Sequence, residues 1–228
     1  MNISSIKNIS FFILLALGYC VMAQSNFESL NESSIALNYK HSETYHLNVS
    51  IQSRAYIFQD DQFTYQQRQF DLTHFSTFSL AYNKSVSLGI RYRNRDLFDD
   101  NSNELRFTQQ FNYTMRREPA RFGHRFRLEQ RIFDDFTVHR LRYRYAIDFP
   151  LNGLKVDVRE PYFIGAMEAL FSIGSTTRPE WDHRTTVQIG WLLTKSFKLQ
   201  FGLEYRFEAL NIKTEHKLFS LVSGIFII

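Results

Sequence analysis

Apolar and polar residues alternate with a period of two along most of the chain after residue 30, and this pattern constrains the fold more than any other feature. In the segment 45–57, Tyr45 and Leu47 share one face, whereas His46 and Asn48 share the other. Successive side chains of a β-strand point to opposite faces, so the pattern predicts strands with one apolar and one polar face. Helical periodicity competes nowhere over more than a few residues. Comparable segments recur at 86–93, 105–115, 140–149, 187–193 and 199–208.

The predicted strands reach about ten residues, which is the length that a tilted strand needs to cross a bilayer. Most strands of globular proteins are shorter. Short turns are expected near 40–43, 83–84, 117–120, 150–153 and 194–197, and longer loops near 59–71, 94–103 and 174–182, with briefer ones near Asp134 and Asn211. The chain has ten predicted strands from Thr44 onward if 156–171 is one long strand, and 34–39 adds an eleventh, so we expect ten to twelve strands. The sequence therefore predicts an all-β, antiparallel transmembrane β-barrel of the outer-membrane type.

The first 23 residues have the features of a secretory signal peptide. Lys7 lies in a short polar start, an apolar run follows at 9–16, and Ala23 ends a small-x-small cleavage pattern. The apolar run is about half as long as a membrane-spanning helix. The residue before Cys20 is too large for a lipidation signal. We expect cleavage after Ala23, export to the cell outer membrane, and a single barrel domain over residues 24–228.

Arginine dominates the polar faces of the predicted strands. The 27 basic residues divide into 19 Arg and 8 Lys, and the lysines lie mostly near turns. Arginine tolerates burial and pairs bidentately with carboxylates, so this face indicates an enclosed, ion-paired lumen. Such a network holds the barrel in one register or blocks its pore, whereas a ring of arginines in an open lumen prefers anions. The candidate lumen residues are Arg125, Arg127, Glu129, Arg131, Arg140, Arg142, Arg144, Glu168, Glu204 and Arg206, with Asp148 and Glu208 as further carboxylates.

The segment 125–131, which reads Arg-Phe-Arg-Leu-Glu-Gln-Arg, is followed by Arg-Leu-Arg-Tyr-Arg-Tyr at 140–145 and by Pro150-Leu151. Together with Glu168 and the Gly-Leu-Glu-Tyr-Arg strand at 202–206, this pattern resembles the Bacteroidetes proteins grouped as domain of unknown function 2490. The resemblance covers essentially the whole mature chain. It implies an outer-membrane barrel of unassigned activity, and it supplies no catalytic residues.

Two groups of Asp and His residues are candidates for catalysis. Asp182-His183, and Asp135 with Asp134 and His139, are similar in residue type to the groups at the mouth of omptin proteases. General acid–base catalysis requires such groups within hydrogen-bonding reach of each other. A rim-located hydrolase is therefore one alternative, and a soluble periplasmic lipocalin-like binding barrel is another. The preferred prediction is a non-enzymatic barrel, either structural or a narrow, porin-like, anion-preferring pore.

Possible ligands and partners follow from charge and composition. Acidic pairs at 60–61, 99–100 and 134–135, and Glu180 with Asp182, suit divalent cations, but ordinary loop composition explains them as well. The histidines lack metal-ligand spacing, so neither a metal nor another cofactor is expected. The net charge of +4 includes no basic block, which argues against nucleic acid. The expected partners are outer-membrane lipid and the barrel-assembly machinery, which reads an apolar C-terminal strand such as 219–228.

Overall fold

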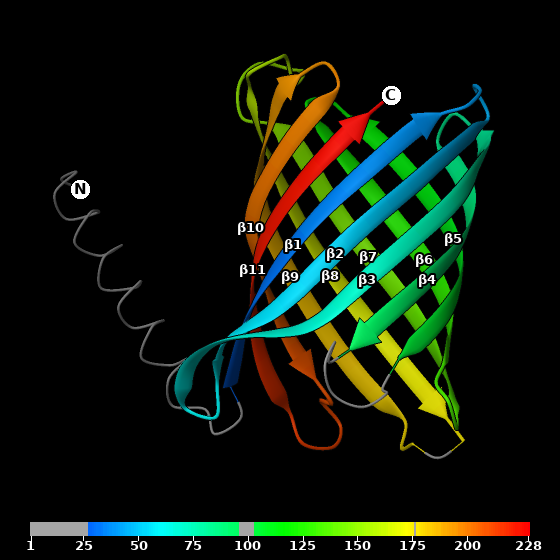
Figure 1. Cartoon of the computed structure of the whole chain (residues 1–228). Coiled ribbons are helices and arrows are strands. Elements are labelled where there is room, and N and C mark those ends of the chain that lie inside the picture. The colour runs from blue at the N-terminus through cyan, green and yellow to red at the C-terminus, as the bar shows by residue number, and fades with distance from the viewer. Residues whose placement is uncertain (1–26, 96–102, 176) are drawn as a thin grey trace, which may run out of the picture.

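The structure is a computed structural model that describes residues 27–95, 103–175 and 177–228, and these form a closed barrel of eleven β-strands (Figure 1). Consecutive strands pair antiparallel. Because the number is odd, the first and last strands run in the same direction and close the barrel as a parallel pair. The predicted all-β barrel of ten to twelve strands is confirmed, with this parallel seam as the exception to antiparallel order. The strands are β1 (Phe27–Lys40), β2 (Tyr45–Gln59), β3 (Gln62–Ala81), β4 (Lys84–Arg95), β5 (Glu104–Arg117), β6 (Ala120–Ile132), β7 (Thr137–Pro150), β8 (Pro161–Gly174), β9 (Glu180–Thr194), β10 (Phe197–Glu208) and β11 (Glu215–Ile227).

The two ends of the barrel differ in their connections. One end, called here the short-turn end, carries the turns at 41–44, 82–83, 118–119 and 195–196, together with the connection 151–160. The opposite end, called the long-loop end, carries the connections 60–61, 96–103, 133–136, 175–179 and 209–214. All the predicted short turns fall at the short-turn end, and all the predicted loops fall at the other.

Two predicted boundaries are wrong. The expected loop at 59–71 is a two-residue turn at Asp60 and Asp61, whose φ angles of 52° and 60° suit a tight hairpin. The run after it belongs to strand β3, where mostly polar residues surround Phe63 and Tyr65 and concealed the strand. The expected single strand at 156–171 begins only at Pro161, because residues 151–160 form a connection across the short-turn end.

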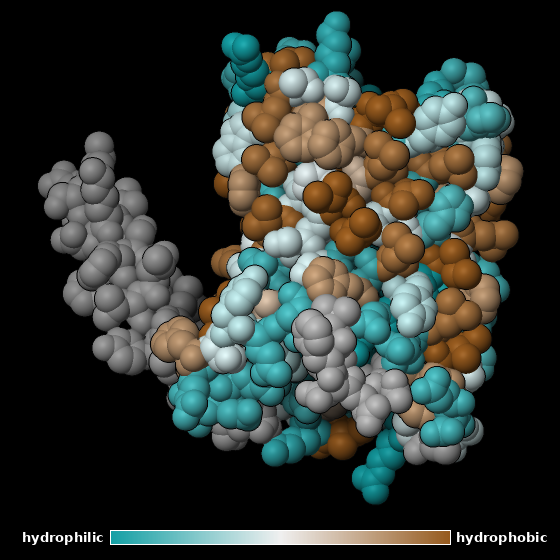
Figure 2. Space-filling model, in the orientation of Figure 1, coloured by the Kyte–Doolittle hydropathy of each residue, from teal (hydrophilic) through white to brown (hydrophobic). Residues whose placement is uncertain are grey.

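The barrel has apolar residues outside and charged residues inside. Outward-facing Leu88, Leu141 and Leu203 are 61%, 56% and 55% exposed. In Figure 2 the apolar surface covers the strands toward the short-turn end, whereas polar residues gather toward the long-loop end. The register between β2 and β3 shifts after Arg54, where β3 has the extra residue Arg68, and the neighbouring Ala55 is almost completely buried.

The predicted signal peptide at 1–23 and the acidic pair at 99–100 lie outside the described residues. No helix in the described part of the chain is long and apolar enough to span a membrane.

Candidate functional site: an arginine-lined lumen

Inward-facing arginines stand opposite each other on neighbouring strands. Arg127 on β6 pairs in register with Arg142 on β7, and Arg125 pairs with Arg144 one step further along the ladder. On β5 and β6, Arg106 lies opposite Arg131. Like charges directly opposite each other destabilise a sheet. The lumen therefore requires carboxylates close to these pairs.

Glu104 and Glu129 supply two of these carboxylates, and both side chains are almost completely buried. Glu104 accepts two hydrogen bonds from Arg131, at 3.0 Å from Nε and 2.9 Å from Nη2, and another from Arg106 Nε at 2.7 Å. Glu129 accepts from Arg142 Nη1 at 2.9 Å and from Arg106 Nη1 at 3.3 Å. Each carboxylate thus separates guanidinium groups that would otherwise repel one another.

Asp71 and Glu168 extend this arrangement along the wall. Asp71 on β3 binds the fork of Arg93 through two hydrogen bonds of 2.8 and 2.7 Å. Glu168 on β8 accepts from Arg142 Nη2 at 2.6 Å and from Arg125 Nη2 at 3.2 Å. Asp71, Glu104, Glu129 and Glu168, here called the four-carboxylate network, and their arginines connect six consecutive strands from β3 to β8.

A second charged cluster covers the remaining wall. Arg206 on β10 hydrogen-bonds to Glu204 at 2.6 Å, and its guanidinium lies 3.7 Å from the centre of the Phe219 ring. Lys217 on β11 contacts Glu208 at 3.0 Å. Phe219 packs with Leu30 and Leu221 in a small buried apolar cluster on β11 and β1. Arg206 therefore contacts both the aromatic face of Phe219 and the carboxylate of Glu204.

Some guanidinium nitrogens in the lumen have no partner among the residues that the structure describes. Within the described part of the chain, Arg144 makes no hydrogen bond and no ion pair, although it is half-buried. The Nε atoms of Arg125, Arg142 and Arg184 are buried without an acceptor among the described residues. Buried donors in proteins normally have partners, so these exceptions require an explanation.

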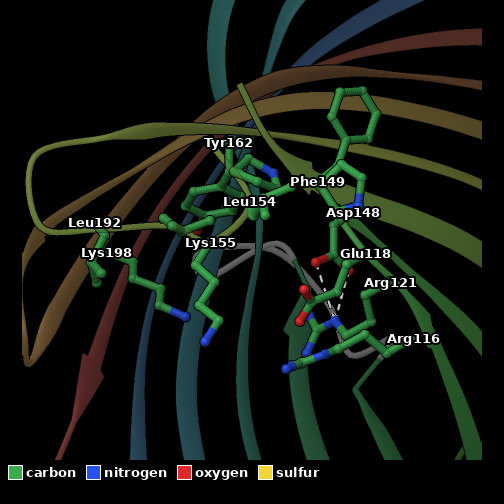
Figure 3. Close-up of a pocket in the computed structure, with 13 residues that line it drawn as sticks. Arg116, Glu118, Arg121, Asp148, Phe149, Leu154, Lys155, Tyr162, Leu192 and Lys198 are labelled. Carbon is green, nitrogen blue, oxygen red and sulfur yellow. Dashed lines mark hydrogen bonds and ion pairs between the residues drawn. The ribbon is translucent and has the colours of Figure 1, made fainter. Parts of the chain in front are cut away.

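The lumen contains a series of cavities that follow one another inward from the short-turn end. At the rim, Figure 3 shows Arg121 bound to Asp148 on one side of a cavity, with the Lys155 and Lys198 side chains on the other. Below it lies an upper cavity of 550 Å³, and then an inner cavity of 270 Å³. The described residues that line the inner cavity include eleven arginines but only three glutamates. Its wall is therefore strongly cationic.

The sequence of the chain matches one family model. The family described as Protein of unknown function (DUF2490) matches residues 33–216, which extend from β1 into β11. The chain belongs to this family. The family resemblance inferred from the arginine-rich strands is thus confirmed. Comparison with curated proteins gives no match.

The structure places all ten predicted lumen residues of this DUF2490 barrel on strands β6 to β10. Their partners come mainly from neighbouring strands. Asp148 pairs with Arg121 at the rim, and Glu208 with Lys217. The residues missed by the sequence analysis include Asp71, Arg91, Arg93, Glu104, Arg106 and Arg184.

The candidate catalytic groups of the DUF2490 barrel do not come together. Asp182 faces the lumen and accepts a hydrogen bond from the backbone N–H of Ala209, whereas His183 follows it on the outer face. His139 lies with Asp134 and Asp135 along an open hollow at the long-loop end, and neither Asp182 nor His183 lines that hollow. Among the described residues, no group of three His, Cys, Asp or Glu side chains is arranged to hold a metal ion.

Proposed function

We propose that this DUF2490 barrel lies in a bacterial outer membrane with its apolar outer surface against lipid. The exposed apolar residues run around the barrel instead of forming one patch, which suits a lipid annulus better than a single protein interface. A soluble barrel would expose this surface to water. Exposed apolar positions on separate strands include Ile35, Ile51, Leu72, Leu88, Leu141, Met167, Val187 and Leu203.

Aromatic residues at the short-turn end support the same proposal. Tyr39, Tyr45, Tyr82, Phe149, Trp191 and Phe197 lie at this end of their strands or in its turns. Several pack against another ring, as in Tyr45 with Phe78 and Phe197 with Phe226, both at 4.7 Å. Such girdles mark the membrane interface of outer-membrane barrels, whose short turns face the periplasm. The partners proposed here are outer-membrane lipid and the machinery that assembles barrels.

We propose further that the lumen is closed and that the barrel is structural and non-enzymatic. The observation that carries this proposal is the four-carboxylate network, in which the residues Asp71, Glu104 and Glu129 are each only 1% exposed. An open, water-filled channel would leave lumen carboxylates solvated. Removal of one partner from a buried network is costly, so the network resists opening.

A narrow, anion-preferring path is the second candidate, because eleven arginines line the inner cavity. Rings of arginine favour anions in pores. A small path along these side chains would exclude cations by charge and larger solutes by size.

Planar-bilayer recording of the refolded mature chain tests these proposals. A closed barrel inserts, as judged by protection of its strands from protease, and carries no steady current. Small anion-selective steps that change in an Arg142→Ala, Arg144→Ala double variant would favour the second candidate instead. A chain that stays out of the bilayer would contradict the membrane location. Arg117→Ala, at an exposed position beside a short turn, is the matched control.

A further inference from the structure

A row of directly paired residues crosses six strands of the lumen and carries an excess of positive charge. Its members, in order from β6 to β11, are Arg125, Arg144, Glu168, Arg184, Arg206 and Lys217. Five members are cations and one is a carboxylate. Neighbouring like charges in such a row require counter-charges from elsewhere.

The counter-charges reach only part of the row. Arg206 and Lys217 have close carboxylates in Glu204 and Glu208. Arg184 has only Glu208, at 3.8 Å, and its Nε has no acceptor among the described residues.

Arg125 and Arg144, on the other side of Glu168 in the row, likewise have too few acceptors for their donor groups. Arg125 contacts Glu168 through Nη2 at 3.2 Å, while its Nε stays unpaired within the described residues. Arg144 has no partner there at all. Three arginines around one carboxylate therefore retain free donors, which are costly in a buried site unless an acceptor arrives.

These free donors border space that a ligand can occupy. Arg125, Arg144 and Arg184 line the inner cavity of 270 Å³, and the first two also line the upper cavity of 550 Å³. A water molecule in the liquid has a share of about 30 Å³, so a solute of several heavy atoms fits. Arg121 and Lys198 line the rim and the upper cavity alike, so positive charge extends from the mouth inward.

We propose that Arg125, Arg144 and Arg184 bind the phosphate group of a small solute that enters from the short-turn end. A phosphate offers several acceptor oxygens in a tetrahedral arrangement, and planar guanidinium forks match such oxygens bidentately. A single chloride would satisfy fewer of the free donors. This inference goes beyond the proposed closed barrel, because it gives the lumen a ligand without requiring conduction.

Titration calorimetry on the full barrel refolded in detergent tests the site. The probes are inorganic phosphate and glycerol phosphate, the latter as the soluble part of a lipid headgroup, with chloride at matched ionic strength as the reference. We expect saturable binding of a phosphate probe, and an Arg144→Gln variant that binds about tenfold more weakly, which corresponds to one lost charge-assisted contact. Arg117→Gln carries the same charge change outside the cavities and should bind as the wild type does.

The outcomes distinguish free phosphate from a lipid headgroup as the ligand. They also test phosphate binding separately from the proposed membrane location. Tighter binding of inorganic phosphate assigns a free anion, and tighter binding of glycerol phosphate assigns a headgroup. If Arg144→Gln does not fold, Arg144→Lys takes its place. This variant keeps the charge but loses the planar guanidinium fork, so it should also bind the phosphate probe several-fold more weakly than the wild type. Absence of saturable binding by either probe, or unchanged affinity in a folded Arg144 variant, would overturn the inference. Insertion into vesicles, measured on the same preparation, reports on the membrane proposal independently.

Discussion

Arg144 lies directly opposite Glu168 in the β7–β8 ladder, yet the Glu168 carboxylate binds Arg142 and Arg125 instead. Arg142 and Arg144 are therefore two inward-facing arginines on the same strand with opposite environments. The first joins Glu129 to Glu168, and the second has no partner among the described residues. Arg142 therefore serves the structural network, whereas Arg144 is available to bind a ligand.

The two arginines should differ in their effect on stability. Arg142→Gln leaves two buried carboxylates without one of their cations, and we expect it to lower the free energy of unfolding by about 3 kcal/mol. Arg144→Gln removes a repulsive charge and should change that free energy by less than about 0.5 kcal/mol, or raise it. Denaturant unfolding in vesicles, followed by the fluorescence of Trp181 and Trp191, measures both. If both variants lost the same free energy of unfolding, the proposed difference between Arg142 and Arg144 would be wrong.

A pair of lumen glycines offers a test of strand packing. A side chain at Gly202 would overlap the backbone of Val187 and Gln188 on β9, whereas the space beside Gly123 is open. We expect Gly202→Ala to lower the free energy of unfolding by about 1–3 kcal/mol, because the strands must separate. Gly123→Ala should be neutral or slightly stabilising, because it reduces the freedom of the unfolded chain. The same denaturant assay applies, and a tolerated Gly202→Ala would contradict the close β9–β10 approach.

If the outer surface faces lipid, a charged residue introduced there should destabilise the folded barrel. Leu88→Arg places a guanidinium on the apolar band, and near the middle of a bilayer this costs about 2–4 kcal/mol of folding free energy. Leu154 is 64% exposed in the 151–160 connection and provides the matched control, Leu154→Arg, with little expected effect. Folding into vesicles over a urea series gives both values. A neutral Leu88→Arg would point to a surface in water.

The orientation of the barrel can be read from single cysteines. Cys20 is the only cysteine of the chain and lies in the predicted signal peptide, so introduced thiols label selectively. With the long-loop end outside, Asp61→Cys should react with a membrane-impermeant maleimide on intact cells, and Lys195→Cys only after the cells are opened. The reverse pattern would invert the proposed orientation.

Much of the fold could be predicted from alternation alone, because a one-residue shift would turn every apolar side chain inward. Alternation gives the face of a residue, but it does not mark where a polar strand begins. The residues after Asp61 on β3 are mostly polar, and the alternation begun by Phe63 and Tyr65 stops at Gln67, so the pattern predicts a loop there. That error removed Asp71 from the candidate lumen residues.

The sequence indicates that the lumen is rich in arginine, but it does not indicate which residues form ion pairs there. Arg125 to Arg144 stand out because their alternation is regular, whereas Glu104 is the first residue of its strand and carries no such signal. Partners depend on register between strands and on rotamers, and the spacing of one strand fixes neither. The unpaired state of Arg144 was likewise invisible, since Glu168 lies within reach in the ladder and binds its neighbours.

Flotation of the refolded mature chain with lipid vesicles, followed by an alkaline wash, tests the central claim of a lipid-embedded barrel most directly. We expect the chain to float with the vesicles, to withstand the wash and to keep its strands protected from protease. A monodisperse chain that remains in the aqueous fraction with its β-structure intact would contradict it.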